Sequence, residues 1–298
     1  MAVANNQTEQ VYKYVEKINP RDRRKAWISR VILWIFVAIV IFPLLAIVTA
    51  SLTEGTGFAS TRLLPEKVSF ANYSAVINDT DFLLWVKNSM VLCLSVAAIQ
   101  LLMTLPAAFA FSKLKFAFRS KGLLSLLILQ MFPTTMALPA ILTIAFNLED
   151  YIGINGMDNI GVIILLLCGG SAYNIWLMKG YMDGIPDDLV EAAYVDGATT
   201  LQVFTKIVLP LMRNMLLVVF LFAFINAYSE FIYSKALLKD ASVQTLATGL
   251  QSFIKDKFSS NWTQYSAAAI LSSIPVVVLF MGLQKYVATG LTAGSVKG

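Results

Sequence analysis

The sequence has no histidine, two cysteines and few charged residues. Without histidine, the chain lacks the commonest general base and the commonest metal ligand of proteins. The cysteines, Cys93 and Cys168, lie singly inside apolar blocks, so their spacing favours neither a metal site nor a redox pair. Charged residues make up 14% of the chain, against roughly 25% in a typical soluble domain, and 57% of residues are hydrophobic. This composition excludes a disordered chain and argues against an ordinary soluble globular protein.

Several chemical motifs are absent as well. The sequence contains no GxxxxGK[ST] phosphate-binding loop, so we expect this chain not to bind ATP. It contains no GxSxG motif or paired carboxylates, and we expect no catalytic residue, no metal site and no cofactor of its own. Charged residues inside the apolar blocks are few, whereas proton-coupled carriers and ion pumps place several ionisable groups at mid-membrane. The sequence therefore predicts a transport route that is driven by another chain.

What the sequence does contain is a series of apolar blocks. A helix needs about 20 apolar residues to cross a hydrocarbon layer of about 30 Å. Six blocks approach or exceed that length, and they predict an all-α, polytopic membrane protein with six transmembrane helices. The blocks lie at about 27–50, 89–112, 122–146, 160–178, 211–232 and 264–287. We expect an N-terminal segment 1–26, a six-span domain 27–287 and a C-terminal tail 288–298.

The distribution of basic residues predicts the orientation of these spans. Cytoplasmic loops carry an excess of Lys and Arg. The first block follows the basic run Arg21–Lys25 and is too long for the apolar region of a signal peptide, so we interpret it as a retained span. Sixteen of the 23 basic residues then fall on cytoplasmic segments. We predict that both termini are cytoplasmic and that the net charge of +5 reflects the cytoplasmic loops, not binding of nucleic acid, in a chain that contacts membrane lipid.

The third cytoplasmic loop, residues 179–210, has a pattern of its own. Pro186 and two following aspartates favour a helix start, and Gly197 allows a left-handed turn that ends the helix. Thr199 or Thr200 can cap a second short helix, and Pro210 marks entry to the next span. The apolar positions that predict two amphipathic helices are Leu189, Val190, Ala193 and Tyr194, then Leu201, Phe204 and Val208. On periodicity alone, they could pack on the protein's own cytoplasmic ends, on the lipid headgroups or against a partner.

The order of residues in this loop resembles the EAA signature of ABC importer permeases. The matching positions are Glu191-Ala192-Ala193, then Gly197 after three residues, of which Asp196 is the last, and Ile207-x-Leu209-Pro210 nine residues later. In that family the loop is the coupling helix, which sits in a cleft on the ATPase subunit. The resemblance implies that these eight residues dock on an ATPase. The small Ala192 and Ala193 would permit close approach, and Glu191 would meet a basic residue.

Further stretches are similar to the MalG-type permeases of maltose and related oligosaccharide importers. They are Gln130-Met131-Phe132-Pro133, Lys179-Gly180-Tyr181 and the C-terminal Gly290–Gly298, in which Ser295 replaces a usual glycine. The resemblance implies a bacterial cytoplasmic-membrane complex with a MalF-like permease, two MalK-like ATPase subunits that bind ATP and Mg, and an extracytoplasmic sugar-binding protein. It also implies that the tail, with Thr292, Ala293, Gly294 and Lys297, reaches the ATPases.

Some polar residues inside the spans are candidates for the transport pathway. A bend at Pro133 and Pro139 would place Thr134 and Thr135 along the route. Asn174, Asn226, Ser229 and Glu230 are the polar residues that we expect to face the cavity or the partner permease. The alternatives are hydrogen bonds between helices for the uncharged residues and a position at the outer interface for Glu230.

Two other functions compete with a maltose or maltodextrin permease. A permease for galacto-oligosaccharides or other plant-derived oligosaccharides would share the same signature and tail. A secondary carrier would need ionisable groups at mid-membrane or an internal repeat, and neither is clear in the sequence. A structural or signalling subunit would not need a signature loop for an ATPase.

Overall fold

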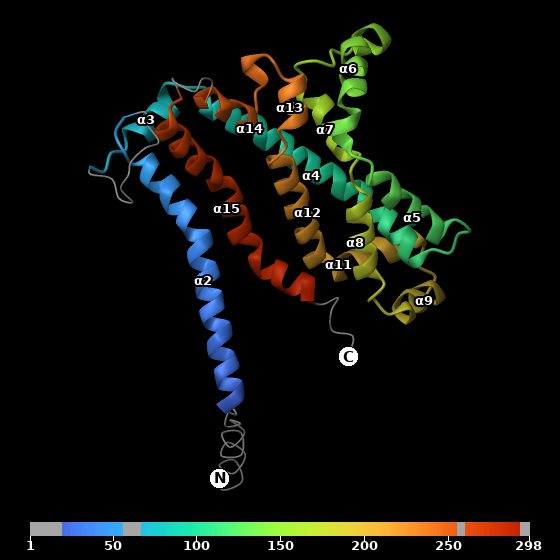
Figure 1. Cartoon of the computed structure of the whole chain (residues 1–298). Helices are drawn as coiled ribbons and strands as arrows, with labels where there is room; N and C mark the ends of the chain where they lie inside the picture. Colours follow the sequence, from blue (N-terminus) through green and yellow to red (C-terminus); the bar gives the residue numbers. More distant parts are fainter. Residues whose placement is uncertain (1–19, 56–66, 255–259, 293–298) are drawn as a thin grey trace.

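The computed structural model describes residues 20–55, 67–254 and 260–292, with the backbone alone for residues 20–22, 134 and 288–292. Within those ranges, every regular element is a helix (Figure 1). The fold is thus all-α, as the sequence predicts.

Four helices in the described part of the chain are long and apolar enough to cross a membrane. They include α2 (Pro20–Ser51), α4 (Phe82–Lys113), α12 (Arg213–Tyr228) and α15 (Trp262–Thr292), and they match the first, second, fifth and sixth predicted blocks. The predicted spans start too late in two cases. Helix α2 begins seven residues before the apolar block at 27–50, and α4 begins seven residues before the block at 89–112. The start of α2 is missed because its residues are polar, and the start of α4 is missed because Lys87 and Asn88 interrupt its apolar run.

The third and fourth predicted spans are each broken into two helices. Helices α5 (Arg119–Gln130) and α6 (Leu138–Ile152) meet at 67°, and α7 (Ile160–Cys168) and α8 (Ala172–Met182) meet at 48°. Pro133, which lacks an amide donor, lies in the first break, before the 3₁₀ turn η2 (Thr134–Ala137). The bend predicted there is confirmed. Counting each bent pair as one span gives six.

The remaining elements are short. They are α3 (Ala71–Asn78), α9 (Asp187–Val195), α10 (Thr200–Val203), the π-helical turn η3 (Phe204–Val208), α11 (Leu209–Leu211), α13 (Ile232–Leu237), η4 (Ala241–Val243), α14 (Leu246–Gly249) and η5 (Leu250–Ile254). In Figure 1, α3, α13 and α14 lie toward the top, whereas α9, α11 and the C-terminal end of α15 lie toward the bottom.

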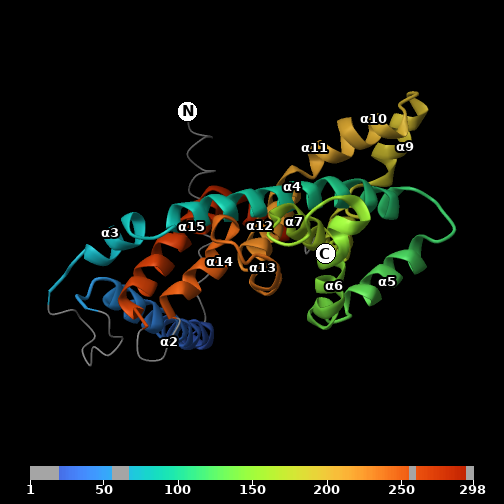
Figure 2. The ribbon, with the colours of Figure 1, turned by 90° about the horizontal axis from the view of Figure 1, so that it is seen from above.

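The long helices pack side by side in an order different from their order in the sequence. Helix α4 contacts α12, α7 and α8, and α15 contacts α12 and α2. Helix α2 stands at one edge, where most of its apolar side chains are exposed. Figure 2 shows α9, α10 and α11 projecting at the end of the molecule away from α2. The exposed apolar face of α2 is suited to contact with lipid or with another membrane helix.

The segment between α13 and α15 is fastened to the first turns of α4. Asn88 Nδ2 donates to the carbonyl oxygens of Ser242 and Gln244, both at 2.9 Å, and Ser89 Oγ accepts from Leu246 N at 2.8 Å. Gly249 sits directly on the indole of Trp85, where an added Cβ would lie 2.2 Å from the ring. Only glycine permits this approach.

We therefore expect Gly249→Ala to destabilise the protein. Its methyl group would force α14 off Trp85, and overpacking of this kind costs about 1–3 kcal/mol. The melting temperature of the detergent-solubilised protein should fall. The matched control is Gly282→Ala, because a Cβ at that helical position has no neighbour within 4 Å. Equal melting temperatures for the two variants would contradict the packing argument.

Candidate functional site

The cytoplasmic loop predicted from the sequence has a defined structure. Pro186 stands at the N-cap of α9, with Asp187 and Asp188 in the first turn. At the other end, Gly197 has φ +81°, its N–H donates to Tyr194 O, and Ala198 N donates to Ala193 O. This is a Schellman motif, which needs a left-handed residue at the glycine position. The predicted helix start and stop are both confirmed.

The second short helix begins at a capping box. Thr199 Oγ1 accepts from Gln202 N at 3.3 Å, and Gln202 Oε1 accepts from Thr199 N at 2.8 Å. The cap is therefore Thr199 and not Thr200, which the sequence left open. The π-helical turn η3 follows and ends just before Pro210. Pro210 has no backbone N–H, so one helical hydrogen bond is missing there.

The predicted apolar stripe of α9 is divided between the interior and the surface. Val190 and Ala193 are buried in a core cluster with Met182 and Val203, whereas Leu189 and Tyr194 are exposed. Ala193 therefore faces this protein's own core, which corrects the prediction that both signature alanines form a docking surface. Ala192 is exposed.

The outward face of α9 carries Glu191, Ala192 and Val195, and Val195 is 87% exposed. The carboxylate of Glu191 makes no hydrogen bond or ion pair with any residue that the structure describes. Leu201 of α10 is likewise exposed. An apolar patch beside an unpaired carboxylate is typical of a surface that another protein covers.

The other signature residues lie on both sides of this division. Asp196, Gly197 and Pro210 are exposed. Ile207 and Leu209 are partly buried, since they pack against the same core cluster as Val190. Part of the signature thus builds the loop, and part is presented on its surface.

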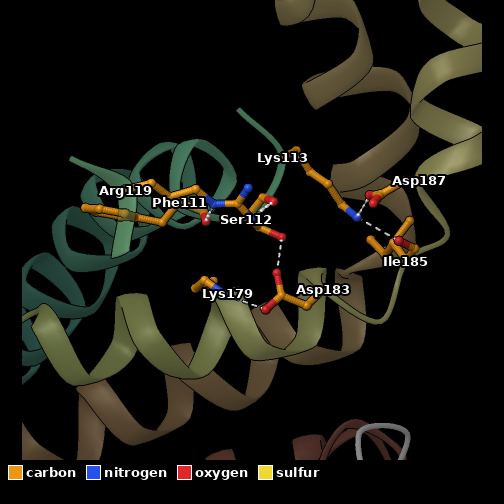
Figure 3. A network of polar contacts seen from close by, with 8 residues as sticks. All are labelled: Phe111, Ser112, Lys113, Arg119, Lys179, Asp183, Ile185 and Asp187. Atoms are coloured by element: carbon orange, nitrogen blue, oxygen red, sulfur yellow. Dashed lines mark hydrogen bonds and ion pairs between the residues drawn. The ribbon is translucent and has the colours of Figure 1, made fainter. Parts of the chain in front are cut away.

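A polar network ties the loop to α4 and α8 (Figure 3). Lys113 Nζ donates to Ile185 O at 2.7 Å and to Asp187 Oδ1 at 2.6 Å. Asp183 accepts from Ser112 Oγ at 2.7 Å and from Lys179 Nζ at 2.5 Å. The end of α4 and the turn between α8 and α9 are therefore held together.

Lys113 and Arg119 are the basic groups at the centre of this anchoring. The Lys113 side chain is 3% exposed, and its ammonium lowers the pKa of the Asp187 carboxyl. A lowered carboxyl pKa stabilises the fold at neutral pH, and this contribution is lost as pH falls through the folded-state pKa. Arg119 Nε donates to Phe111 O at 2.7 Å, so the start of α5 is tied to the end of α4 (Figure 3). The cytoplasmic loop between α4 and α5 thus helps to hold the 179–210 loop in place.

A second polar arrangement joins the two helix breaks. Gln130, the last residue of α5, donates from Nε2 to Gly170 O at 3.0 Å and accepts at Oε1 from Tyr173 N at 2.8 Å. Gly170 lies in the break between α7 and α8, and Tyr173 lies in the first turn of α8. One side chain at the first break therefore satisfies two backbone groups at the second.

Gln100, in the middle of α4, holds the same break from the other side. Its Nε2 donates to Leu167 O at 2.8 Å, and its Oε1 accepts from Asn174 Nδ2 at 3.1 Å. Sequence reasoning missed Gln100. The available signal was a glutamine between apolar residues in a span, where polar side chains usually bond to another helix.

A cavity of about 500 Å³ lies beside the breaks. Residues of α4, of both breaks and of α12 with its following turn line it. They are Val96, Gln100, Gln130, Met131, Phe132, Pro133, Leu166, Leu167, Gly170, Ala223, Asn226, Ala227, Glu230 and Tyr233. Two of the predicted pathway residues, Asn226 and Glu230, are among them.

Three other candidates lie elsewhere. Asn174 donates a hydrogen bond to Gln100 of another helix and is not among the residues that line the cavity. This is the hydrogen bond between helices that the sequence offered as the alternative to a pathway position. Ser229 Oγ bonds to carbonyl oxygens of its own helix, at Ile225 and Asn226, because a hydroxyl can bond back one turn. Thr135 is exposed but is not among the residues that line the cavity. The side chain of Thr134 lies outside the described residues.

Glu230 has a second role that the sequence did not reveal. It follows α12, and its carboxylate accepts from Tyr233 N at 2.6 Å and from Ser234 N and Oγ at 3.0 and 2.6 Å. These donors lie in the first turn of α13, where a carboxylate is favoured by the helix dipole. Glu230 is therefore held in place by its own chain at the edge of the cavity.

The predicted tail residues lie at or beyond the end of the part of the chain that the structure describes. Thr292 is the last residue of α15, and Ala293, Gly294 and Lys297 lie outside the described residues.

The broken spans, the cavity beside them and the anchored loop define a multi-pass membrane protein of the transport-permease class. Residues 98–292 match the family described as "Binding-protein-dependent transport system inner membrane component". This match covers more than half of the chain, so the chain belongs to that family. It is a transport component and not an enzyme.

The chain is similar to curated permeases along nearly its whole length. It is 34% identical over 296 residues to "Maltose/maltodextrin transport system permease protein MalG" of Escherichia coli strain K12, covering 94% of this chain and 99% of the relative. Identity to the MalG of Vibrio vulnificus strain YJ016 is also 34%, over 287 residues.

Solved structures show the same architecture. A chain of "a bacterial ABC transporter involved in the import of the acidic polysaccharide alginate" superposes with a TM-score of 0.75 at 25% identity, covering 90% of this chain and 98% of the other. A chain of the MetNI methionine ABC transporter, at 16% identity and a TM-score of 0.53, shares the fold alone.

The cavity position of Asn226 can be tested by chemical labelling. On a background that lacks Cys93 and Cys168, Asn226→Cys should react with a water-soluble thiol reagent, because its side chain is exposed at the cavity. The rate should change with the nucleotide state of the assembled transporter. Val219→Cys, at a fully buried position of the same helix, is the control and should not react. Inertness of the cysteine at 226 in every state would place it against lipid or protein.

Proposed function

We propose that this chain is a permease subunit of an ATP-driven, binding-protein-dependent importer of maltose and maltodextrins. It would form half of the translocation pathway. The main support is the anchored signature loop, whose outward face bears the unpaired Glu191. In addition, the chain is related to maltose permeases along 94% of its length. A loop fixed on one side and uncovered on the other is suited to transmitting movement from a partner.

The proposal includes a set of partners. A second, MalF-like permease would complete the pathway, two MalK-like ATPase subunits would bind ATP and Mg, and an extracytoplasmic binding protein would deliver the sugar. The chain would lie in the bacterial cytoplasmic membrane with the 1–26 segment, the 179–210 loop and the tail on the cytoplasmic side. Support for this orientation comes from the basic-residue bias and from Figure 1, where α9 and the end of α15 lie at the same end of the molecule.

The contact with the ATPase would centre on the outward face of α9. Glu191 would meet a basic group there, and Ala192 is small enough to let the two surfaces approach. Removing one partner of a buried ion pair costs about 3–5 kcal/mol, against about 0–1 kcal/mol for an exposed pair. Gly197 would set the angle between the two short helices.

Glu191→Lys should therefore abolish transport while the permease still inserts in the membrane. The measurement is co-purification of the ATPase, together with sugar uptake by reconstituted vesicles. Glu149→Lys is the control, because Glu149 is also exposed but lies on α6, at the opposite end of the molecule (Figure 1). A charge reversal on the ATPase should rescue Glu191→Lys. Normal transport by Glu191→Lys would show that this loop is not the coupling element.

Gly197→Val should also weaken docking, but for a different reason. A Cβ at this position meets no atom within 4 Å, so the defect would come from the left-handed backbone, at a cost of about 1 kcal/mol or more. The same co-purification measures it. The charge reversal on the ATPase should leave this variant unrescued, and rescue would contradict the geometric argument.

The tail is the second proposed contact with the ATPases. Deleting Thr292–Gly298 should leave assembly intact and lower sugar-stimulated ATP hydrolysis by the purified complex. The control is the undeleted complex at matched ATPase content. Unchanged hydrolysis and transport would remove the tail from the proposal.

A further inference from the structure

We propose that Asn88 and Lys113 are positioning residues of the transporter, and that α4 links the 179–210 loop to the 242–254 segment at its other end. This inference rests on the proposed function and deepens it, because it assigns residues of this chain to communication between the binding protein and the ATPases. Each of the two residues lies near one end of α4 and bonds to a segment that is distant in the sequence. Figure 2 shows α4 running from the α3 end of the molecule to the end at which α9 and α10 project.

The first turns of α4 hold the segment that follows α13. Asn88 Nδ2 donates to Ser242 O and to Gln244 O, both at 2.9 Å. The indole of Trp85 packs edge-on against Phe253, with the ring centroids 6.2 Å apart. Since Asn88, Trp85 and Phe253 are all buried, a shift of the segment along α4 would separate the rings and leave a buried amide without its acceptors.

The opposite side of this segment is open. Gln244, Gln251 and Ser252 are among the residues that line a cavity of about 660 Å³, and the last two are exposed. In the proposed orientation this side faces the binding protein. A segment that is held by α4 on one side and open on the other can receive a contact and pass the displacement to the helix.

The last turns of α4 hold the 179–210 loop at two places. Lys113 Nζ donates to Asp187 Oδ1 at 2.6 Å, in the first turn of α9. Phe109 packs on Phe204 of η3, with the ring centroids 5.1 Å apart. Helix α4 therefore contacts both halves of the loop, so a displacement of either half reaches the same helix.

Between these two ends, α4 is a single helix that is held along its whole length. Its 32 residues span about 48 Å at the usual rise. Buried positions recur from Phe82 to Ser112, and the helix packs against α12, α7 and α8. Pro106 removes one backbone hydrogen bond, but the helix continues without a break to Lys113. Because close-packed elements transmit strain, we expect α4 to move as one body.

The two end contacts therefore act in series. A coupling free energy between two sites is shared by both, so the binding protein and the ATPase would favour the same position of α4. Breaking the contact at either end interrupts the same link. Once one contact is lost, loss of the other has nothing further to remove, and the two effects are not additive.

The test measures ATP hydrolysis by the assembled transporter in lipid vesicles, with and without a saturating amount of sugar-loaded binding protein. Each variant is compared with its own rate without binding protein, and saturation removes differences in affinity. Asn88→Leu and Lys113→Met should each lower the stimulation at least about fivefold, the lower end of usual coupling between sites. The double variant should lower it no further than the stronger single variant. Lys113→Arg, which keeps a cationic donor, should retain most of the stimulation.

The controls carry the same changes at positions outside α4. Asn78→Leu alters an exposed asparagine that bonds to Ser74 of its own helix, and Lys121→Met removes an exposed lysine from the first turn of α5. Both should keep the stimulation of the starting chain. Ser89→Ala and Ser112→Ala are milder variants of the two ends, since each removes a single hydrogen bond. They should also lower the stimulation, and they give the test if the larger changes prevent assembly.

The outcomes separate this inference from the proposed function. Unchanged stimulation in the variants of either end would overturn the link through α4. Losses that multiply in the double variant would also overturn it, because they would show two independent effects. Binding-protein-dependent sugar uptake by the starting chain tests the permease function separately, and that function stands if α4 is not the link.

Discussion

Inside a hydrocarbon layer, a backbone amide or carbonyl has no water to bond, so every helix break must be satisfied by the protein itself. In this chain, Gln100 and Gln130 meet that requirement for the break between α7 and α8. Two bent spans can therefore exist side by side with a polar cavity between them and α12. Without such side chains, the carbonyl oxygens of Leu167 and Gly170 would lack these hydrogen bonds.

Helix α8 connects this region to the loop. Tyr173 and Asn174 near its start bond to the two glutamines, and Lys179 and Asp183 at its end belong to the anchoring network. Its 11 residues span about 16 Å at the usual rise. A displacement of α9 would be carried along one short, rigid helix to the edge of the cavity. The loop and the cavity are thus two ends of one mechanical element.

The sequence predicted elements better than surfaces. Apolar blocks located the spans, and Gly197 and Pro186 located the ends of α9, because those signals are local. The division of the α9 stripe was not predictable, since which flank of a helix is buried depends on Met182 and Val203 elsewhere in the chain. Asn226 and Glu230 line the cavity, whereas Asn174 bonds to Gln100. The sequence could not separate these cases, because a polar residue in a span can face a route or another helix equally well.

The exposed apolar face of the loop has a consequence for assembly in the cell. Leu189, Val195 and Leu201 are uncovered in the isolated chain, beside a carboxylate without a partner. A permease that has inserted but has no ATPase displays a sticky patch to the surrounding proteins, where chaperones and proteases recognise such surfaces. Docking of the proposed ATPase would hide it. The patch proposed for coupling would then also mark subunits without a partner, and removal of unassembled subunits would keep the stoichiometry of the complex.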